Sequence, residues 1–232
     1  MEVKKWKCLT SQNLKLIALI TMTLDHIGAV LLPQFLVLRV IGRLAFPIYS
    51  FLIVNGFFYT RNWKKYLMRL FMFAGISEVC FDLTFFGKVL YWGYQNVYFT
   101  LALGLLMIAL LEKIRTKNEN RLSKLYWNRW IEVLVVLLVC GIAWLIQSDY
   151  HIFGILMIYG FYQFRTLNWN AILYQAIINA ILMGGVQGFA VMALPVIGMY
   201  NGKPGTTKMK WMFYLYYPLH LMVIYFIKSY ST

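Results

Sequence analysis

Residues 14–33 read LKLIALITMTLDHIGAVLLP, a run of 20 residues in which the only ionisable side chains are Lys15, Asp25 and His26. As an α-helix this run would rise about 30 Å, which is the thickness of the hydrocarbon core of a bilayer. The stretch therefore predicts a membrane-spanning helix. Because it also predicts a carboxylate and an imidazole within that span, it points to a functional site inside the membrane.

The composition of the whole chain agrees with this interpretation. Of the 232 residues, 61% are hydrophobic and 13% are charged, whereas soluble domains have about 45–50% apolar and about 25% charged residues. These proportions exclude a soluble enzyme, a nucleic-acid-binding domain and a disulfide-rich secreted domain. The three cysteines, Cys8, Cys80 and Cys140, form neither a CxxC pair nor a Cys/His metal-ligand spacing, so we expect no metal site.

Apolar runs recur along the chain and predict an all-α fold, a polytopic transmembrane helical bundle of about nine spans. The expected spans are residues 14–33, 36–58, 66–86, 97–112, 131–147, 151–164, 169–184, 186–200 and 211–227. Only Gly184-Gly185 separates the seventh span from the eighth, so the count depends on a turn there. Since the sequence has no internal repeat or long linker, we interpret residues 1–232 as a single domain.

The basic residues predict how the chain is oriented. With the N-terminus inside, 18 of the 22 Lys and Arg residues fall in inner segments, and only Lys88 and Lys228 fall in outer ones. The remaining two, Arg39 and Arg43, lie within the second span. Because Lys and Arg are retained on the cytoplasmic side, we expect a multi-pass plasma-membrane protein with its C-terminus outside. The net charge of +14 then reflects the lipid bilayer as partner and not nucleic acid.

Several ionisable side chains are predicted inside the spans, where each costs about 2.5–3.5 kcal/mol to insert. They are Asp25, His26, Arg39, Arg43, Glu78, Asp82 and His220. Counted at 1.5 Å per residue from the outer ends of their spans, Asp25, Arg43 and Glu78 all lie roughly 10–12 Å deep. Arg39 and Asp82 form a second layer nearer the outer surface. We therefore expect Arg43 to neutralise carboxylates at its own level, and Arg39 to meet Asp82.

Two interpretations of this cluster stay open, namely ion pairs that hold the bundle together and a reactive site. The reactive site explains His26 better, because an imidazole titrates near neutrality and a neighbouring carboxylate can orient it. We expect Asp25, Glu78 or Asp82 to orient the ring, and His26 to act as general base or as acyl carrier.

Three other segments carry polar residues. His220 follows Pro218, which removes a backbone hydrogen bond, and either a kink or a binding site would explain this arrangement. The segment 149–151 is expected to be a solvated outer loop. The inner end of the second span carries side chains that could hold the phosphates of a cytoplasmic nucleotide-bearing ligand. They are Arg61, Asn62, Lys64 and Lys65.

Eight segments within residues 14–227 carry a family resemblance. They are MTLDHIG (22–28), RVIGRLAFP (39–47), GFFYTRN (56–62), ISEVCFD (76–82), NVYFTLALG (96–104), DYHIFGILMI (149–158), ALPVIGMYNGKPG (193–205) and FYLYYPLHL (213–221). Together they resemble the TraX family, which is named for a conjugation protein associated with acetylation of the pilin N-terminus. That family is similar to the broader transmembrane acyltransferases that use acyl-CoA.

The resemblance implies an integral membrane acetyltransferase that takes acetyl-CoA, its acyl donor, from the cytoplasm. In the broader group a membrane histidine is catalytic, and His26 in MTLDHIG matches that position. The acceptor would be an amine or hydroxyl of a peptide, sugar or polymer. The main alternative is a proton-coupled transporter or exporter that uses the intramembrane charges, and a third is a scaffold or assembly factor.

The resemblance and the charged cluster together assign three groups of site residues. The expected catalytic residues are His26, Asp25, Arg43 and Glu78. The expected substrate-binding residues are Arg39, Asp82, Asn96 and His220. The expected acetyl-CoA-binding residues are Arg61, Asn62, Lys64 and Lys65.

Overall fold

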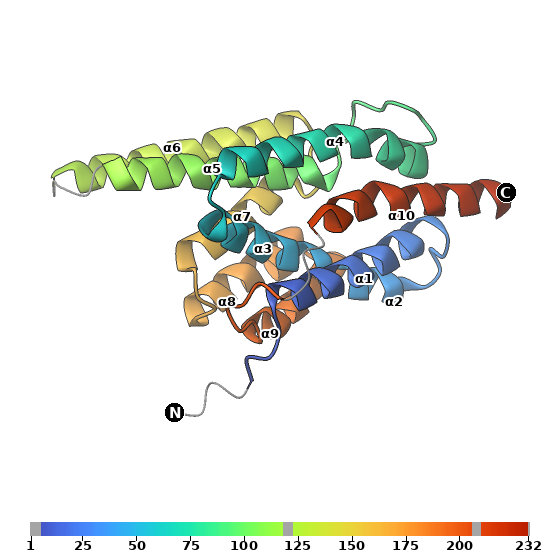
Figure 1. Ribbon diagram of the computed structural model, residues 1–232, viewed down its shortest axis with the longest axis horizontal. Helices are drawn as coiled ribbons and strands as arrows, with labels where there is room; N and C mark the ends of the chain where they lie inside the picture. The colour runs from blue at the N-terminus through green and yellow to red at the C-terminus, as the bar shows by residue number, and fades with distance from the viewer. Residues whose placement is uncertain (1–5, 118–122, 206–209, 232) are drawn as a thin grey trace.

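The computed structural model describes residues 6–117, 123–205 and 210–231, and these residues are helical apart from loops and two isolated β-bridges (Figure 1). The elements are α1 (Ser11–Val30), α2 (Leu36–Gly42), α3 (Ala45–Tyr59), α4 (Trp63–Phe86), α5 (Val97–Lys117), α6 (Ser123–Leu145), α7 (His151–Phe164), α8 (Trp169–Ala176), the π-helix η1 (Ile177–Met183), the 3₁₀-helix η2 (Gly185–Met192), α9 (Ala193–Gly198) and α10 (Lys210–Ser231).

Helix is present at every apolar run that predicts a span, so the all-α fold is confirmed. Among the residues that the structure describes, three helical segments, Ser11–Val30, Leu36–Tyr59 and Val97–Thr116, are long and apolar enough to cross a bilayer. The chain is therefore a membrane protein. The helical segments between residues 151 and 198 are shorter, and nine complete crossings stay a prediction.

The second predicted span is not one continuous helix, because it breaks between α2 and α3 at Arg43 and Leu44. Pro47 lies in the first turn of α3 and has no backbone N–H to donate to the carbonyl of Arg43, and its ring would clash with that carbonyl in a continuous helix. A helix can begin just before a proline but cannot pass through one without this loss. The break leaves Arg43 at the end of a helix, in the middle of the bundle.

The predicted turn at Gly184-Gly185 is confirmed. Gly184 and Gly185 have φ values of 62° and 54°, which glycine adopts without the steric cost that other residues meet. The turn reverses the chain between η1 and η2, and both of these helices depart from α-helical hydrogen bonding. Such irregular helix is tolerated at membrane depth where neighbouring protein groups satisfy the backbone.

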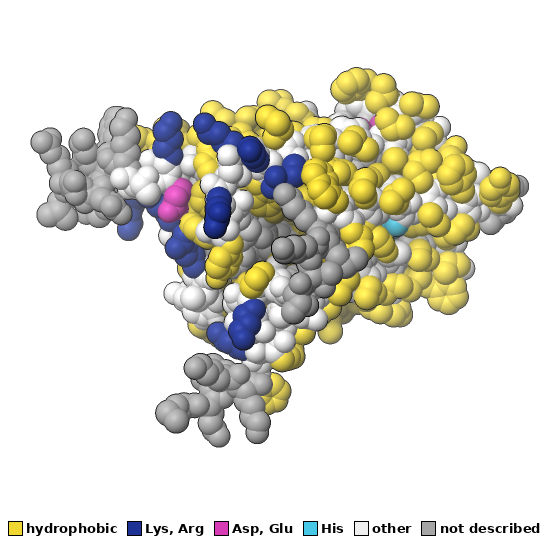
Figure 2. Space-filling model, viewed as in Figure 1, with side chains coloured by type: hydrophobic (Ala, Val, Ile, Leu, Met, Phe, Trp, Pro, Cys, Tyr) yellow, Lys and Arg dark blue, Asp and Glu magenta, His cyan; other side chains and the backbone are white. Residues whose placement is uncertain are grey.

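The C-terminal end of α10 lies at one end of the long axis, whereas the described chain begins below the middle of the molecule (Figure 1). We call the end where α3 ends and α4 begins the basic end, after Arg61, Lys64 and Lys65. Figure 2 shows Lys and Arg side chains gathered at one end of the molecule and hydrophobic side chains over much of the rest of that face. The N-inside, C-outside orientation requires this separation, but the orientation itself stays a prediction.

The helices that position the site are α1, α2, α3, α4 and α10. α10 packs against both α4 and α1, and α1 also packs against α2 and α3. Pro218 leaves the carbonyl of Tyr214 without its usual partner in α10, and the hydroxyl of Tyr98 donates to that carbonyl at 3.0 Å. The proline is therefore accommodated by a side chain from α5.

Candidate functional site

Two neighbouring cavities lie between the helices. The inner cavity, of about 580 Å³, is lined near the basic end by residues that include Lys15, Tyr66 and Arg69. The outer cavity, of about 430 Å³, lies toward the opposite end, and residues that include Asp25 and His26 line it. Four side chains line both cavities and form the wall between them. They are Met22, Tyr49, Val97 and Tyr217.

His26 lies beside this wall, on the outer side. It follows Met22 by one turn of α1, so the two side chains share a face of the helix, and its ring meets that of Tyr217 edge-on at a centroid distance of 6.1 Å. Nδ1 of His26 lies 2.7 Å from Nε2 of His220 on α10. Nδ1 of His220 lies in turn 2.9 Å from the carbonyl oxygen of Tyr216.

The partner of His26 differs from the sequence expectation. None of Asp25, Glu78 and Asp82 forms a hydrogen bond with the ring in the described part of the chain, and His220 does so instead. The expectation that a carboxylate orients His26 is therefore wrong. The reason is that depth along a helix axis predicts the level of a side chain but not the direction in which it points.

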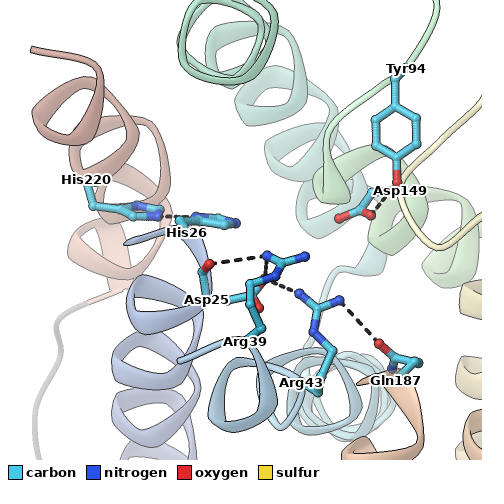
Figure 3. Close-up of polar contacts among 8 residues, drawn as sticks. All are labelled: Asp25, His26, Arg39, Arg43, Tyr94, Asp149, Gln187 and His220. Carbon is cyan, nitrogen blue, oxygen red and sulfur yellow. Dashed lines mark hydrogen bonds and ion pairs between the residues drawn. The ribbon is translucent and has the colours of Figure 1, made fainter. Parts of the chain in front are cut away.

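Asp25 joins the two arginines of the second span (Figure 3). Its Oδ2 accepts a hydrogen bond from Nη2 of Arg43 and lies 3.0 Å from Nη1 of Arg39. Arg43 also donates from Nη1 to Oε1 of Gln187 on η2, at 3.3 Å. The predicted pairing of Arg43 with Asp25 is confirmed, whereas the pairing of Arg39 with Asp82 is wrong. The side chain of Arg43 is 14% exposed and that of Arg39 is 33% exposed, so Arg39 is the more accessible cation.

A glycine allows this ion-pair cluster to form. A Cβ atom on Gly42 would lie 2.2 Å from Cβ of Asp25, a separation at which neither side chain could keep its place. Gly28 makes a similar close contact, since a Cβ atom there would lie 2.8 Å from Cβ of Leu38. Together the two glycines bring α1 and α2 close enough for Asp25 to reach both arginines.

Glu78, Asp82 and Asn96 are buried, but none of them lines either cavity. Glu78 accepts hydrogen bonds from the side chain and the backbone N–H of Asn96, and Asn96 also donates to the carbonyl oxygen of Ala74 at 2.8 Å. Asp82 accepts from the backbone N–H of Tyr91 at 2.6 Å. These three side chains hold the loop before α5 against α4, and the expected contact between Glu78 and Arg43 is absent from the hydrogen bonds and ion pairs of the described residues.

Sequence reasoning missed Asp149, which lines the outer cavity together with Tyr94 and Tyr150. The hydroxyl of Tyr94 donates to Oδ1 of Asp149 at 2.8 Å. Burial raises the pKa of this carboxyl to about 6. Tyr150 and His151 follow with φ values of 62° and 44°, a backbone conformation that is uncommon outside glycine and is often found at functional sites. The expectation of a solvated loop is wrong for Asp149 and Tyr150, because both line the outer cavity.

The basic side chains in the inner cavity are also not the expected ones. Lys15 and Arg69 line it, whereas the four predicted residues do not. Of these, Arg61, Lys64 and Lys65 are exposed, and Asn62 caps α4 by accepting from the backbone N–H of Lys65 at 3.0 Å. Lys15 interrupts an otherwise apolar part of the first span, and this interruption is the signal by which the sequence could have identified it.

Comparison with known proteins identifies the family. The sequence profile described as "TraX protein" matches residues 10–228. The chain belongs to the TraX family. A relative in Dichelobacter nodosus, the probable fimbrial assembly protein FimC of serogroup H1, is 31% identical over 246 aligned positions, which cover 91% of this chain and 93% of that protein.

A second relative is the uncharacterized protein RP591 of Rickettsia prowazekii (strain Madrid E). It is 28% identical over 170 aligned positions, which cover 73% of this chain and 62% of that protein. No solved structure matches the chain. The TraX family is associated with pilin acetylation, which is consistent with a transferase in general terms.

Proposed function

We propose that this protein is a plasma-membrane acetyltransferase that moves an acetyl group from cytoplasmic acetyl-CoA to an amine or hydroxyl acceptor in the outer half of the membrane. The observation that carries the proposal is the position of His26 beside the wall shared by the two cavities. A donor that enters from the basic end and an acceptor that enters from the opposite end would meet at this side chain.

The inner cavity suits the donor. Its volume of about 580 Å³ falls in the range of about 300–1,000 Å³ that is typical of sites for small molecules and cofactors. Lys15 and Arg69 supply positive charge for the phosphates of CoA, and tyrosines such as Tyr66 and Tyr214 line the same space. The pantetheine arm would extend toward the shared wall and bring the thioester next to His26.

The reaction needs a base, a cation and a path for the leaving group. His26 takes the proton from the acceptor amine or hydroxyl as that atom attacks the thioester carbonyl. Both terminal nitrogens of Arg43 already donate, one to Asp25 and the other to Gln187. Because Arg39 is the more exposed of the two arginines, we assign its guanidinium N–H groups to the oxyanion. The carbon–sulfur bond then breaks, the thiolate takes the proton from His26, and CoA leaves through the inner cavity. In the covalent alternative, the ring of His26 carries the acetyl group between donor and acceptor.

The outer cavity would hold the acceptor. The groups that line it include a cation, Arg39, and a carboxylate, Asp149, with the aromatic side chains of Phe46, Tyr94 and Tyr150 between the helices. A pilin subunit is one acceptor suggested by the family, and a cell-surface sugar or polymer is another. Glu78, Asp82 and Asn96 lie outside the two cavities, so we assign them a supporting role.

The alternative functions make different predictions for one assay. Purified protein would be incubated with acetyl-labelled acetyl-CoA and a panel of amine- and hydroxyl-bearing acceptors, and free CoA thiol would be measured. An acetyltransferase releases thiol in step with labelled acceptor. A proton-coupled transporter or a scaffold that makes use of the same intramembrane charges releases none, and absence of thiol across the panel would count against the proposal.

The donor site leads to a prediction about two basic residues. Lys15→Gln and Arg69→Gln should each weaken acetyl-CoA binding by about 10–100-fold, because each removes a hydrogen bond to a charged group worth about 1.5–3 kcal/mol. Equilibrium binding of acetyl-CoA to purified protein measures this loss. Lys64→Gln is the matched control, since Lys64 is exposed outside the cavity and should bind as the wild type does. Equal affinity in all four proteins would place the phosphates elsewhere.

The orientation leads to a second prediction. A reporter fused to the C-terminus should report the outside, and one inserted in the segment 118–122, which lies outside the described residues, should report the inside. The reason is the retention of Lys and Arg on the cytoplasmic side. A reporter pair such as alkaline phosphatase and a fluorescent protein measures this, and both positions on one side would overturn the orientation.

A further inference from the structure

A chain of two imidazoles and a backbone carbonyl crosses from α10 to α1. The rings of His26 and His220 are inclined by only 8°, with a centroid distance of 5.0 Å and a nitrogen–nitrogen distance of 2.7 Å. Figure 3 shows them end to end, with the second ring nitrogen of His26 directed away from His220. We propose that His220 is a positioning residue that holds His26 in the tautomer whose Nε2 lone pair faces the outer cavity.

The direction of each hydrogen bond follows from the carbonyl. The carbonyl oxygen of Tyr216 can only accept, so Nδ1 of His220 carries a proton and donates it. A neutral imidazole carries one N–H, and therefore Nε2 of His220 is an acceptor. The nitrogen opposite it, Nδ1 of His26, must then be the donor. A neutral His26 with its proton on Nδ1 has its lone pair on Nε2.

Neighbouring contacts keep the two rings in line. The hydroxyl groups of Thr23 and Tyr216 lie 2.8 Å apart and join α1 to α10 one turn from the histidines. The ring of Tyr216 lies nearly parallel to that of His220, at a centroid distance of 5.2 Å and an angle of 15°. Phe85 meets the ring of His26 edge-on at 5.5 Å. These contacts restrict rotation of both imidazoles, which is the usual role of groups that orient a functional histidine.

The hydrogen bond between His26 and His220 also offers a path for a second proton. When Nε2 of His26 takes a proton from the acceptor, Nδ1 can pass its own proton to Nε2 of His220, which then carries the positive charge with N–H on both nitrogens. This transfer moves the charge away from Arg39 and Arg43, and it reverses when the thiolate is protonated. The use of the relay in catalysis rests on the proposed acetyl transfer, but the tautomer does not.

The tautomer can be measured without any activity. The chain has three histidines, so protein labelled at histidine with nitrogen-15, in lipid nanodiscs, gives few signals, and single histidine variants assign them. At neutral pH we expect His26 and His220 each to show a protonated Nδ1 and an unprotonated Nε2. A His26 with a protonated Nε2 and a bare Nδ1 would overturn the proposal, whether or not the protein transfers acetyl groups.

Two substitutions test the functional role. In His220→Gln the side-chain oxygen reaches about as far as Nε2 and can still accept from His26, whereas His220→Phe cannot accept. We expect His220→Phe to lower kcat for acetyl transfer by about 10–100-fold, as loss of an orienting partner does, with KM for acetyl-CoA unchanged. His220→Gln should lose clearly less and keep the tautomer of His26.

A control separates this role from simple packing. Thr84→Val removes a different hydrogen bond between helices, from the hydroxyl of Thr84 on α4 to the carbonyl oxygen of Leu221 on α10, and should leave both kcat and the His26 signals unchanged. Equal losses in the Gln and Phe variants, with the His26 tautomer retained in both, would mean that His220 acts only through its shape.

Discussion

His26→Gln is expected to lower the rate of acetyl transfer by about 10²–10⁴-fold, the usual contribution of a positioned general base. Glutamine is polar and of similar size, but it cannot take a proton. Binding of acetyl-CoA should change little, because the donor is held in the inner cavity and His26 lines the outer one. Turnover and equilibrium binding, measured on the same preparation, separate the two effects.

His151→Gln is the matched control for this experiment. His151 lies near the same end of the bundle but lines neither cavity, so its variant should retain the wild-type rate. Ping-pong kinetics, together with a fall in the rate of acetyl transfer of more than about 10⁴-fold in His26→Gln, would favour the covalent role of His26. A His26→Gln protein that transfers acetyl groups at nearly the wild-type rate would refute the assignment of His26.

Asp25→Asn should cause the largest loss of stability among the changes in the ion-pair cluster. Asp25 is the carboxylate between Arg39 and Arg43, and its loss strands two guanidinium groups inside the bundle. Removing one partner of a buried ion pair costs about 3–5 kcal/mol, and we expect a loss of that size in the free energy of unfolding. Reversible unfolding in mixed detergent micelles measures it.

Changes to the arginines provide the comparison. Arg43→Gln leaves Asp25 paired with Arg39, and should therefore cost less than Asp25→Asn. Arg43→Lys should preserve folding better than activity, because lysine keeps the charge but not the paired donors that bind Asp25 and Gln187. The double change Asp25→Asn with Arg43→Gln should recover part of the loss. An Arg43→Gln protein less stable than Asp25→Asn would contradict the shared pairing.

The sequence predicted the helices well because membrane spans have a strong signal. Every apolar run is helical, although three of the runs are divided between two helical elements, and the Gly184-Gly185 turn forms where the glycines suggest it. The break before α3 was also detectable, since Pro47 cannot continue the helix past Arg43. The length of an apolar run and the presence of a helix-breaking proline or glycine are local properties of the sequence. The sequence alone is therefore enough to locate the helices and their breaks.

The candidate site was only partly predictable. Counting residues placed Asp25 and Arg43 at the same depth, and they do meet. It could not tell that Glu78 points toward Asn96, because depth carries no information about rotation around the helix axis. Nor could it show that α10 packs beside α1 and brings His220 to His26, since contacts between distant helices depend on the packing of the whole bundle.

In the proposed reaction, donor and acceptor reach His26 from opposite sides of the membrane. The most direct measurement uses sealed proteoliposomes in which the protein has one known orientation. Acetyl-CoA is supplied on one side, and the other side receives an acceptor that is acetylated in the thiol-release assay and cannot cross the membrane. Acetylated acceptor should form when acetyl-CoA is on the side of Lys15 and Arg69, and its formation should be lost in His26→Gln. Product formed equally well with acetyl-CoA on the opposite side, or only when both substrates share a side, would rule out transfer between the two cavities.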